Sequence, residues 1–149
     1  MKRHAAFTLV ELMIVLVIVA ILAALSYPAY TAYMIKTRRA EAQVALLEAM
    51  QHQERYFSLH NTYLAFSADS SGDDELRFPW WLGANPLRSA YELSGGACKD
   101  LTLQSCIELR AVPGTSRVDP KFRDADCETL TLNSAGEHGA GGKQTGCWP

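Results

Sequence analysis

Residues 7–27 have the sequence FTLVELMIVLVIVAILAALSY, and this apolar stretch decides how the rest of the chain is organised. As a helix it would span roughly 31 Å, about the thickness of the hydrocarbon core of a bilayer. It follows the basic residues Lys2 and Arg3, which predict that the N-terminal end stays on the cytoplasmic side of a membrane. We therefore expect residues 7–29 to form a transmembrane helix.

A secretory signal peptide is the main alternative, because it also joins a basic leader to an apolar segment. Small residues at Ala23, Ala24 and Ser26 could mark a cleavage site. However, Pro28 follows closely, the amphipathic pattern continues beyond it, and the apolar stretch is longer than a usual signal core. These features favour an anchor that the mature protein retains.

Glu11 is the charged residue within this stretch. A carboxylate deep in lipid costs roughly 3 kcal/mol, so it needs a partner or a proton. No Lys or Arg lies within one helical turn of it. Removal of residues 1–6 would create an amino group at Phe7, which could pair with the Glu11 carboxylate of the same or a neighbouring chain. The alternative is a Glu11 that lies at the level of the lipid headgroups, in contact with solvent.

The N-terminal sequence resembles the prepilin signature of type IV pilins. The resemblance rests on residues 7–12, which follow a basic leader and precede an unbroken apolar helix. It continues through residues 28–30 and 38–42. Because residue types, spacing and topology all agree, this motif is highly specific.

The resemblance implies several site residues. Residues 1–6 would be a leader peptide that a prepilin peptidase removes between Ala6 and Phe7, and Phe7 would then be N-methylated. Phe7 and Glu11 would act in subunit docking. Ala6 stands where the family usually has Gly. Pro28 is expected to kink the helix.

Residues 30–60 continue the helix with an amphipathic pattern. One stripe recurs at spacings of three and four, and it consists of Ala42, Leu46, Ala49, Met50, Gln53 and Phe57. The charged side chains fall mostly on other faces, which are expected to contact solvent: Arg38, Arg39, Glu41, Glu48, Glu54 and Arg55. The stripe should be covered by a sheet.

Residues 61–149 are expected to hold a loop, an antiparallel sheet and a C-terminal disulfide-bonded region. Residues 61–85 have the composition of a loop. Three later segments alternate apolar and polar residues, namely 91–93, 106–112 and 128–133. Such alternation predicts antiparallel strands with one buried face. Residues 139–142 are too rich in glycine for a strand interior and should be loop. The predicted fold class is α+β.

Four cysteines lie on the C-terminal side of the anchor, at Cys98, Cys106, Cys127 and Cys147. Their spacing gives no CxxC pair and no pairing with His, so a zinc site is not expected. An oxidising compartment makes disulfides the default, with three possible connectivities. Proximity on a hairpin favours Cys98 with Cys106, which leaves Cys127 with Cys147.

No sequence motif indicates catalysis, a metal or a cofactor. A nucleophile elbow, a phosphate loop and an HExxH motif are all missing from the sequence. The acidic residues 73–75 lack the pattern of a calcium loop and are expected to be solvated. Trp80 and Trp81 could form a ligand platform, but packing in the core or as a lid over the sheet is the favoured interpretation. We therefore expect no enzyme.

A second resemblance covers the C-terminal half. Residues 126–133, followed by Gly136 and Cys147-Trp148, are similar to the C-terminal half of PilE-type minor pilins. Residues 53–57 and 61–63 match the end of the helix in the same family. This pattern distinguishes the sequence from type II secretion pseudopilins, whose heads commonly lack such a disulfide loop.

Charge gives no general reason to expect nucleic-acid binding. The 149 residues include 14 basic and 16 acidic side chains, for a net charge of −2. A DNA-binding head would need a basic stripe, for which the candidates are Arg110, Arg117, Lys121 and Arg123. Acidic residues interleave with them at Asp119, Asp124 and Asp126. Nucleic acid is therefore predicted to be an improbable partner.

Taken with the resemblance, the sequence predicts a minor subunit of a type IV pilus that serves pilus biogenesis, twitching motility and adhesion. Its partners would be other pilin subunits, the inner-membrane assembly machinery and the prepilin peptidase. The precursor would lie in the bacterial inner membrane with a periplasmic head, and the mature subunit in the extracellular pilus. The alternatives are a DNA-uptake receptor pilin, a major pilin and a type II secretion pseudopilin.

Overall fold

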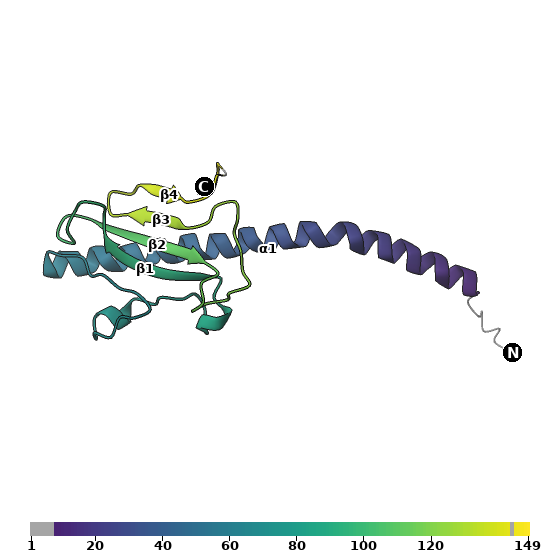
Figure 1. Cartoon of the computed structure of the whole chain (residues 1–149), viewed down its shortest axis with the longest axis horizontal. Helices are drawn as coiled ribbons and strands as arrows, with labels where there is room; N and C mark the ends of the chain where they lie inside the picture. The colour runs from purple at the N-terminus through teal and green to yellow at the C-terminus, as the bar shows by residue number, and fades with distance from the viewer. Residues whose placement is uncertain (1–7, 144) are drawn as a thin grey trace. The chain divides into compact units, whose positions relative to one another are not determined.

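The computed structural model describes residues 8–143 and 145–149, without the side chains at positions 25, 26, 28 and 29. The chain forms two compact units, of which the first ends at Lys36 and the second, here called the head, is Thr37–Pro149. In order, the elements are a long helix, two short 3-10 helices and four strands (Figure 1).

Helix α1 is Leu9–His60. Thr8 caps its start, because the Thr8 hydroxyl accepts a hydrogen bond from the Glu11 backbone N–H at 3.2 Å. The helix passes through Pro28; the side chain of that residue lies outside the described part, so the kink expected there stays a prediction.

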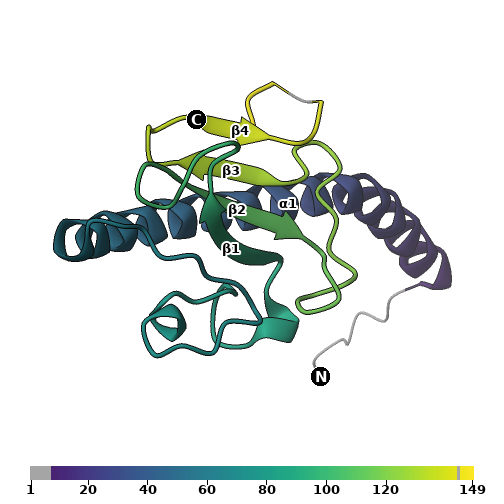
Figure 2. The ribbon, with the colours of Figure 1, turned by 60° about the vertical axis from the view of Figure 1, so that its left-hand side comes forward.

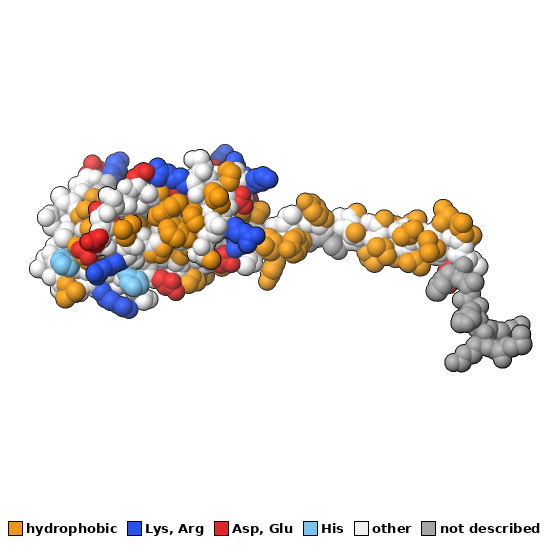
Figure 3. Space-filling view, turned by 90° about the horizontal axis from the view of Figure 1, so that it is seen from below, with side chains coloured by type: hydrophobic (Ala, Val, Ile, Leu, Met, Phe, Trp, Pro, Cys, Tyr) orange, Lys and Arg blue, Asp and Glu red, His pale blue; other side chains and the backbone are white. Residues whose placement is uncertain are grey.

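The large apolar side chains of the first half of α1 are exposed around the helix. From Leu9 to Leu22 their exposed fractions lie between 51% and 75%, and they form the hydrophobic surface of the narrow segment in Figure 3. Among the described residues, no helical segment is both long and apolar enough to cross a membrane.

The head contains a sheet of four antiparallel strands in the order β1-β2-β3-β4 (Figure 2). The strands are β1 Tyr91–Ala97, β2 Ile107–Pro113, β3 Leu130–Asn133 and β4 His138–Ala140. Alternate side chains of the first three strands are buried, as period-two patterning requires. The connecting 3-10 helices are η1 Glu75–Arg77 and η2 Pro86–Arg88.

The expectation that residues 139–142 are loop is wrong for Gly139 and Ala140, which lie in β4 opposite Thr131 and Leu130. A Cβ at position 139 would collide with the Thr131 hydroxyl. Glycine here permits a close approach of two strands, so it is compatible with the sheet rather than opposed to it.

The core lies between the helix and the sheet. Ala42, Leu46 and Ala49 on α1 are buried and belong to one apolar cluster with strand residues such as Leu93 and Leu109. Gln53, on the same stripe, is fully buried, and its amide exchanges hydrogen bonds with the backbone of Leu64 at 2.7 and 3.0 Å. The stripe predicted from spacing therefore faces the sheet.

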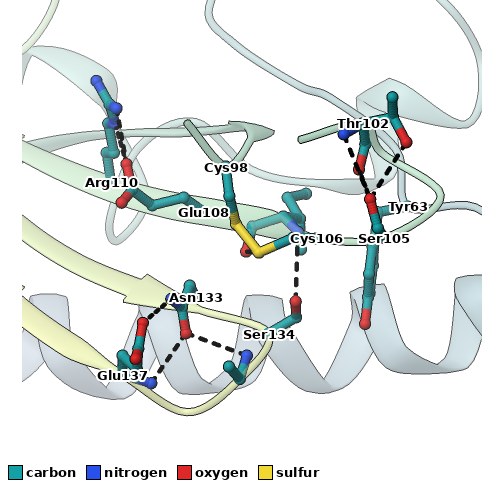
Figure 4. The surroundings of a disulfide bond; sticks show 12 residues. Tyr63, Cys98, Thr102, Ser105, Cys106, Glu108, Arg110, Asn133, Ser134 and Glu137 are labelled. Atoms are coloured by element: carbon teal, nitrogen blue, oxygen red, sulfur yellow. Dashed lines mark hydrogen bonds and ion pairs between the residues drawn. A yellow bond between two sulfur atoms is a disulfide. The ribbon is translucent and has the colours of Figure 1, made fainter. Parts of the chain in front are cut away.

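Two disulfides cross-link segments that flank the strands of the sheet. Cys98 pairs with Cys106 across the turn between β1 and β2 (Figure 4), and Cys127 pairs with Cys147. The latter holds the C-terminal segment beside β4, where the Trp148 indole N–H donates to the Gly139 carbonyl at 2.8 Å. This contact covers part of an edge strand that would otherwise expose its backbone.

Candidate functional site

A buried ionic network joins α1 to the connection between β2 and β3. The Arg39 guanidinium donates two hydrogen bonds to the Asp124 carboxylate, at 2.8 and 2.6 Å. The same carboxylate accepts a bond from the Tyr91 hydroxyl at 2.6 Å and from the backbone N–H of Cys127 at 3.3 Å. The expectation that Arg39 is solvated is wrong, because only 8% of it is exposed. Its position three residues before Ala42 places it on the buried face.

This network shifts the pKa values of its members. Burial alone would raise the pKa of Asp124, but hydrogen bonds from Arg39, Tyr91 and the Cys127 backbone, with the charge of Arg39, outweigh it and hold the pKa below its usual value. Burial and the bond to Asp124 raise the pKa of Tyr91. The network is thus a fixed ion pair within the head and not a proton-exchanging site.

Of the four basic residues predicted for a DNA-binding stripe, two are paired with acidic side chains, and Lys121 is exposed. Arg110 pairs with Glu108 at 2.7 Å, and Arg117 pairs with Asp69 at 2.7 Å. Arg123 donates to the backbone carbonyls of Pro120 and Phe122. These three guanidinium groups are therefore engaged within the head, and Arg110 lies on β2, apart in sequence from the other two.

A different cationic surface lies at the C-terminal end of α1, and the sequence analysis did not identify it. We call it the helix-end surface; it consists of His52, Arg55, Tyr56, Leu59, His60, Arg77 and Phe78 around a hollow of about 180 Å³. In Figure 3, histidine and arginine or lysine side chains lie next to one another on the head. The recurrence of cations and rings at helical spacing in residues 52–60 is the signal that could have identified it.

The contacts of the helix-end surface leave its charges available. Arg55 makes no side-chain hydrogen bond or ion pair within the part of the chain that the structure describes. Arg77 has 78% of its side chain exposed and approaches Asp74 only to 3.6 Å. The rings of Tyr56 and His60 stack at 4.1 Å. An anion would meet the guanidinium groups of Arg55 and Arg77 beside the stacked rings of Tyr56 and His60.

A second hollow, which we call the aromatic pocket, adjoins the helix-end surface. It has a volume of about 250 Å³ and lies between α1 at Ala45–His52 and the segment 77–83. Trp81 lines it, and Trp81 meets Trp80 edge to face at 5.0 Å. Both tryptophans are half-buried, so they lie neither in the core nor fully in solvent.

Other candidate residues contribute no clustered site. In the described ranges, no group of three or more His, Cys, Asp or Glu side chains could hold a metal ion. Glu11 is exposed on the first turns of α1. Ala6 and Phe7, the predicted cleavage and methylation residues, lie outside the described residues, so their roles stay predictions.

Comparisons with known proteins match nearly the whole chain except its C-terminal end. Residues 28–131 match the family model described as "Type IV minor pilin ComP, DNA uptake sequence receptor". Residues 1–27 match the model described as a prokaryotic N-terminal methylation motif. Among curated protein sequences, none is a significant match.

Two solved structures are similar to this chain. A type IV pilin from Shewanella oneidensis is 27% identical, over 77% of this chain and 98% of its own, with a TM-score of 0.47. The non-core minor pilin PilV of Neisseria meningitidis is 19% identical, over 77% of this chain and 94% of its own, also with a TM-score of 0.47.

Proposed function

Because this chain belongs to the type IV minor pilin family described as a DNA uptake sequence receptor, we propose that its head binds DNA while its N-terminal helix holds it in a pilus. The prediction of a minor type IV pilin is confirmed by the family match. Pilins are structural or receptor proteins, in line with the expectation that the chain is no enzyme. What remains to be argued is how each part of the chain would serve these roles.

The filament role rests on the exposed apolar surface of the first half of α1. Side chains such as Leu12 and Leu16 are 56% and 60% exposed, and a continuous apolar surface of this kind requires lipid or another protein to cover it. We infer that cleavage before Phe7 frees an amine, that methylation follows, and that Glu11 pairs with this amine when subunits dock. An unpaired charge in the helical bundle would be costly, so the pair would set the register.

Glu11→Ala tests this role. The variant should still insert in the membrane but should be strongly depleted in sheared pili, because the amine would lose its counter-charge. Glu41→Ala is the matched control, since Glu41 is an exposed acid on the same helix that pairs with Arg38. Normal incorporation of Glu11→Ala, measured by immunoblot of sheared fibres, would refute the pairing.

The receptor role rests on the helix-end surface, where Arg55 has no side-chain partner among the described residues and Arg77 is highly exposed. Guanidinium groups bind phosphates, and aromatic faces such as that of Tyr56 stack with bases. The expectation that nucleic acid is an improbable partner relied on net charge and on acidic residues among the candidate basic ones, and neither bears on the helix-end surface. The family description counts against that expectation and favours the DNA-receptor alternative.

Fluorescence anisotropy with a labelled DNA duplex tests the receptor role on the full chain in detergent. Arg55→Gln should weaken binding and reduce the salt slope by about 1, the value for one lost phosphate contact. Arg110→Gln is the control, because Glu108 already neutralises Arg110. DNA binding that is missing, independent of salt, or weakened equally by both variants would contradict the proposal.

The two disulfides support a location outside the cytoplasm, where such bonds persist. We propose that the precursor lies in the inner membrane with its head in the periplasm, and that the mature subunit joins other pilins in the extracellular filament. The amount of the chain in purified pili tests this: a few copies per filament fit the proposal, whereas absence of the chain from the pili would contradict it.

A further inference from the structure

The aromatic pocket has walls that are already in place. Phe78 stacks on Phe66 at 5.1 Å, with the two ring planes 21° apart. Trp81 is held through its backbone, which bridges to Glu92 on β1, and the neighbouring carbonyl of Trp80 accepts from the Leu93 N–H at 2.8 Å. A ligand would therefore enter a preformed site and would not need to order it.

The hollow exists because α1 presents two alanines, Ala45 and Ala49, toward segment 77–83. Its volume of about 250 Å³ is below the range of roughly 300–1,000 Å³ that is usual for ligand pockets. A single ring system would fit, whereas a larger ligand would not. The volume and the aromatic lining therefore favour one flat aromatic group between Trp81 and the helix.

The polar side chains on the lining favour a ring that carries both donors and acceptors. Glu48 offers a carboxylate, Arg77 a guanidinium, and His52 an imidazole. A plain hydrocarbon ring could not form hydrogen bonds with these groups. A nucleobase has a flat apolar face for Trp81 and hydrogen-bonding groups around its edge for the others.

The aromatic pocket and the helix-end surface share His52, Arg77 and Phe78. A base in the pocket would therefore have its phosphates beside Arg55 and Arg77, whose charges are available. We propose that the aromatic pocket receives one unpaired nucleobase of a DNA strand bound along the helix-end surface, an inference that rests on the proposed DNA-receptor function.

The base must be unpaired because bases inside a duplex are stacked and their faces are covered. The pocket would thus select a single strand, a strand end or an extruded base over a closed duplex. An aromatic side chain from a neighbouring pilin is the competing occupant. Arg55, which makes no side-chain ion pair among the described residues, and the highly exposed Arg77 favour a ligand that carries negative charge, which such a side chain does not.

The test compares three DNA probes of equal length on the full chain in detergent: a single strand, a fully abasic strand and a blunt duplex. The abasic strand keeps the phosphates and removes every base. The single strand should bind about five-fold or more tightly than the abasic strand, the gain expected of one stacked base. Ala45→Leu should fill the pocket and remove this gain without changing the affinity for the abasic strand.

Ala40→Leu is the matched control, because it adds the same side chain at an exposed alanine of the same helix.

A second readout, the fluorescence of Trp81, does not depend on filling the pocket. In a variant with Trp80→Phe and Trp148→Phe, Trp81 is the remaining tryptophan of three. Its emission should be quenched by the single strand and not by the abasic strand.

Other results would contradict the proposal that the aromatic pocket binds a base. Equal affinity for the single and abasic strands would leave the proposed DNA-receptor function intact and remove the base pocket. The same holds if Ala45→Leu keeps the full preference. If Ala45→Leu instead reduces incorporation into pili and leaves DNA binding unchanged, the pocket holds a side chain of a neighbouring subunit. Binding of none of the three probes would overturn both proposals.

Discussion

The two halves of α1 are equally helical but differ in what covers them. Leu12 and Leu16 in the first half are more than half exposed, whereas Leu46 in the second half is 1% exposed beneath the sheet. The chain itself supplies the cover for one half and leaves the other to its surroundings. Helical structure alone thus says nothing about stability, because burial of the apolar face supplies most of it.

This difference separates two kinds of mutational effect. Changes in the second half should alter the free energy of unfolding of the head. Changes in the first half should alter association with other subunits and leave the head unaffected. Denaturation of the full chain in detergent, followed by near-ultraviolet circular dichroism, measures the first effect, and recovery in sheared pili measures the second.

Among these variants, Arg39→Met should cause the largest decrease in the free energy of unfolding of the head. It would leave Asp124 buried without its counter-charge, and loss of one partner of a buried ion pair costs about 3–5 kcal/mol. Arg38→Met, one residue earlier and exposed, should cost at most about 1 kcal/mol. Equal losses would show that Arg39 is not the residue that ties α1 to the β2–β3 connection.

A double variant sharpens this result. Arg39→Met with Asp124→Leu replaces the whole pair by apolar groups, which is often nearly neutral. It should therefore recover part of the stability that Arg39→Met loses, and the remainder is the cost of leaving the Tyr91 hydroxyl and the Cys127 N–H without their acceptor. A double variant as unstable as the single one would attribute the loss to packing of the Arg39 side chain instead of its charge.

The two halves can be compared directly by the same substitution. Leu46→Ala should destabilise the head by about 2–5 kcal/mol, because it removes a fully buried side chain and leaves a cavity. Leu16→Ala should leave unfolding of the head unchanged and lower the amount of the chain in sheared pili. A loss of head stability from Leu16→Ala would contradict the separation of the two effects.

The sequence predicted the elements whose partners follow a regular period. The stripe through Ala42 and Leu46 was identified from helical spacing, and residues 106–112 match β2 with a shift of one residue. Strand β1 was predicted as residues 91–93 but extends to Ala97. Gly95 interrupts the pattern there, because a Cβ would approach the Phe66 ring to 2.7 Å.

The site was less predictable, since its contacts join distant residues. Arg39 and Asp124 are 85 positions apart, so no local pattern shows that they pair. Likewise, Arg110 and Arg117 were candidates for binding DNA until their acidic partners in the fold were known. Charge patterns indicate which residues could act, but tertiary contacts decide which of them remain available.

The disulfides extend the comparison to the sheet. Loss of Cys127–Cys147 through paired Ser substitutions should cost about 3 kcal/mol, and loss of Cys98–Cys106 somewhat less, because the shorter loop constrains the unfolded chain less. The first change should also release Trp148 from β4. An unchanged free energy of unfolding after either change would contradict the expectation.

The smallest effect concerns Tyr91 and depends on pH. Tyr91→Phe removes a hydrogen bond to a charged group, worth about 1.5–3 kcal/mol. Because the pKa of Tyr91 is raised in the folded head, its contribution is complete below about pH 10 and is lost as the pH rises further. The difference in the free energy of unfolding between the parent chain and Tyr91→Phe should therefore decrease above that pH.

Asp124 should act at the opposite end of the pH scale. Its pKa is lowered in the folded head, so its contribution to the free energy of unfolding is present above about pH 4 and is lost as the pH falls through the folded value.

The control for the alkaline effect is Tyr30→Phe. Tyr30 is an exposed tyrosine of the first half of α1, so this variant should leave the stability of the head unchanged at every pH. If Tyr30→Phe and Tyr91→Phe gave the same dependence of the free energy of unfolding on pH, the loss of stability at alkaline pH would come from the solvent-exposed tyrosines. The buried network of Arg39, Asp124 and Tyr91 would then play no part in it.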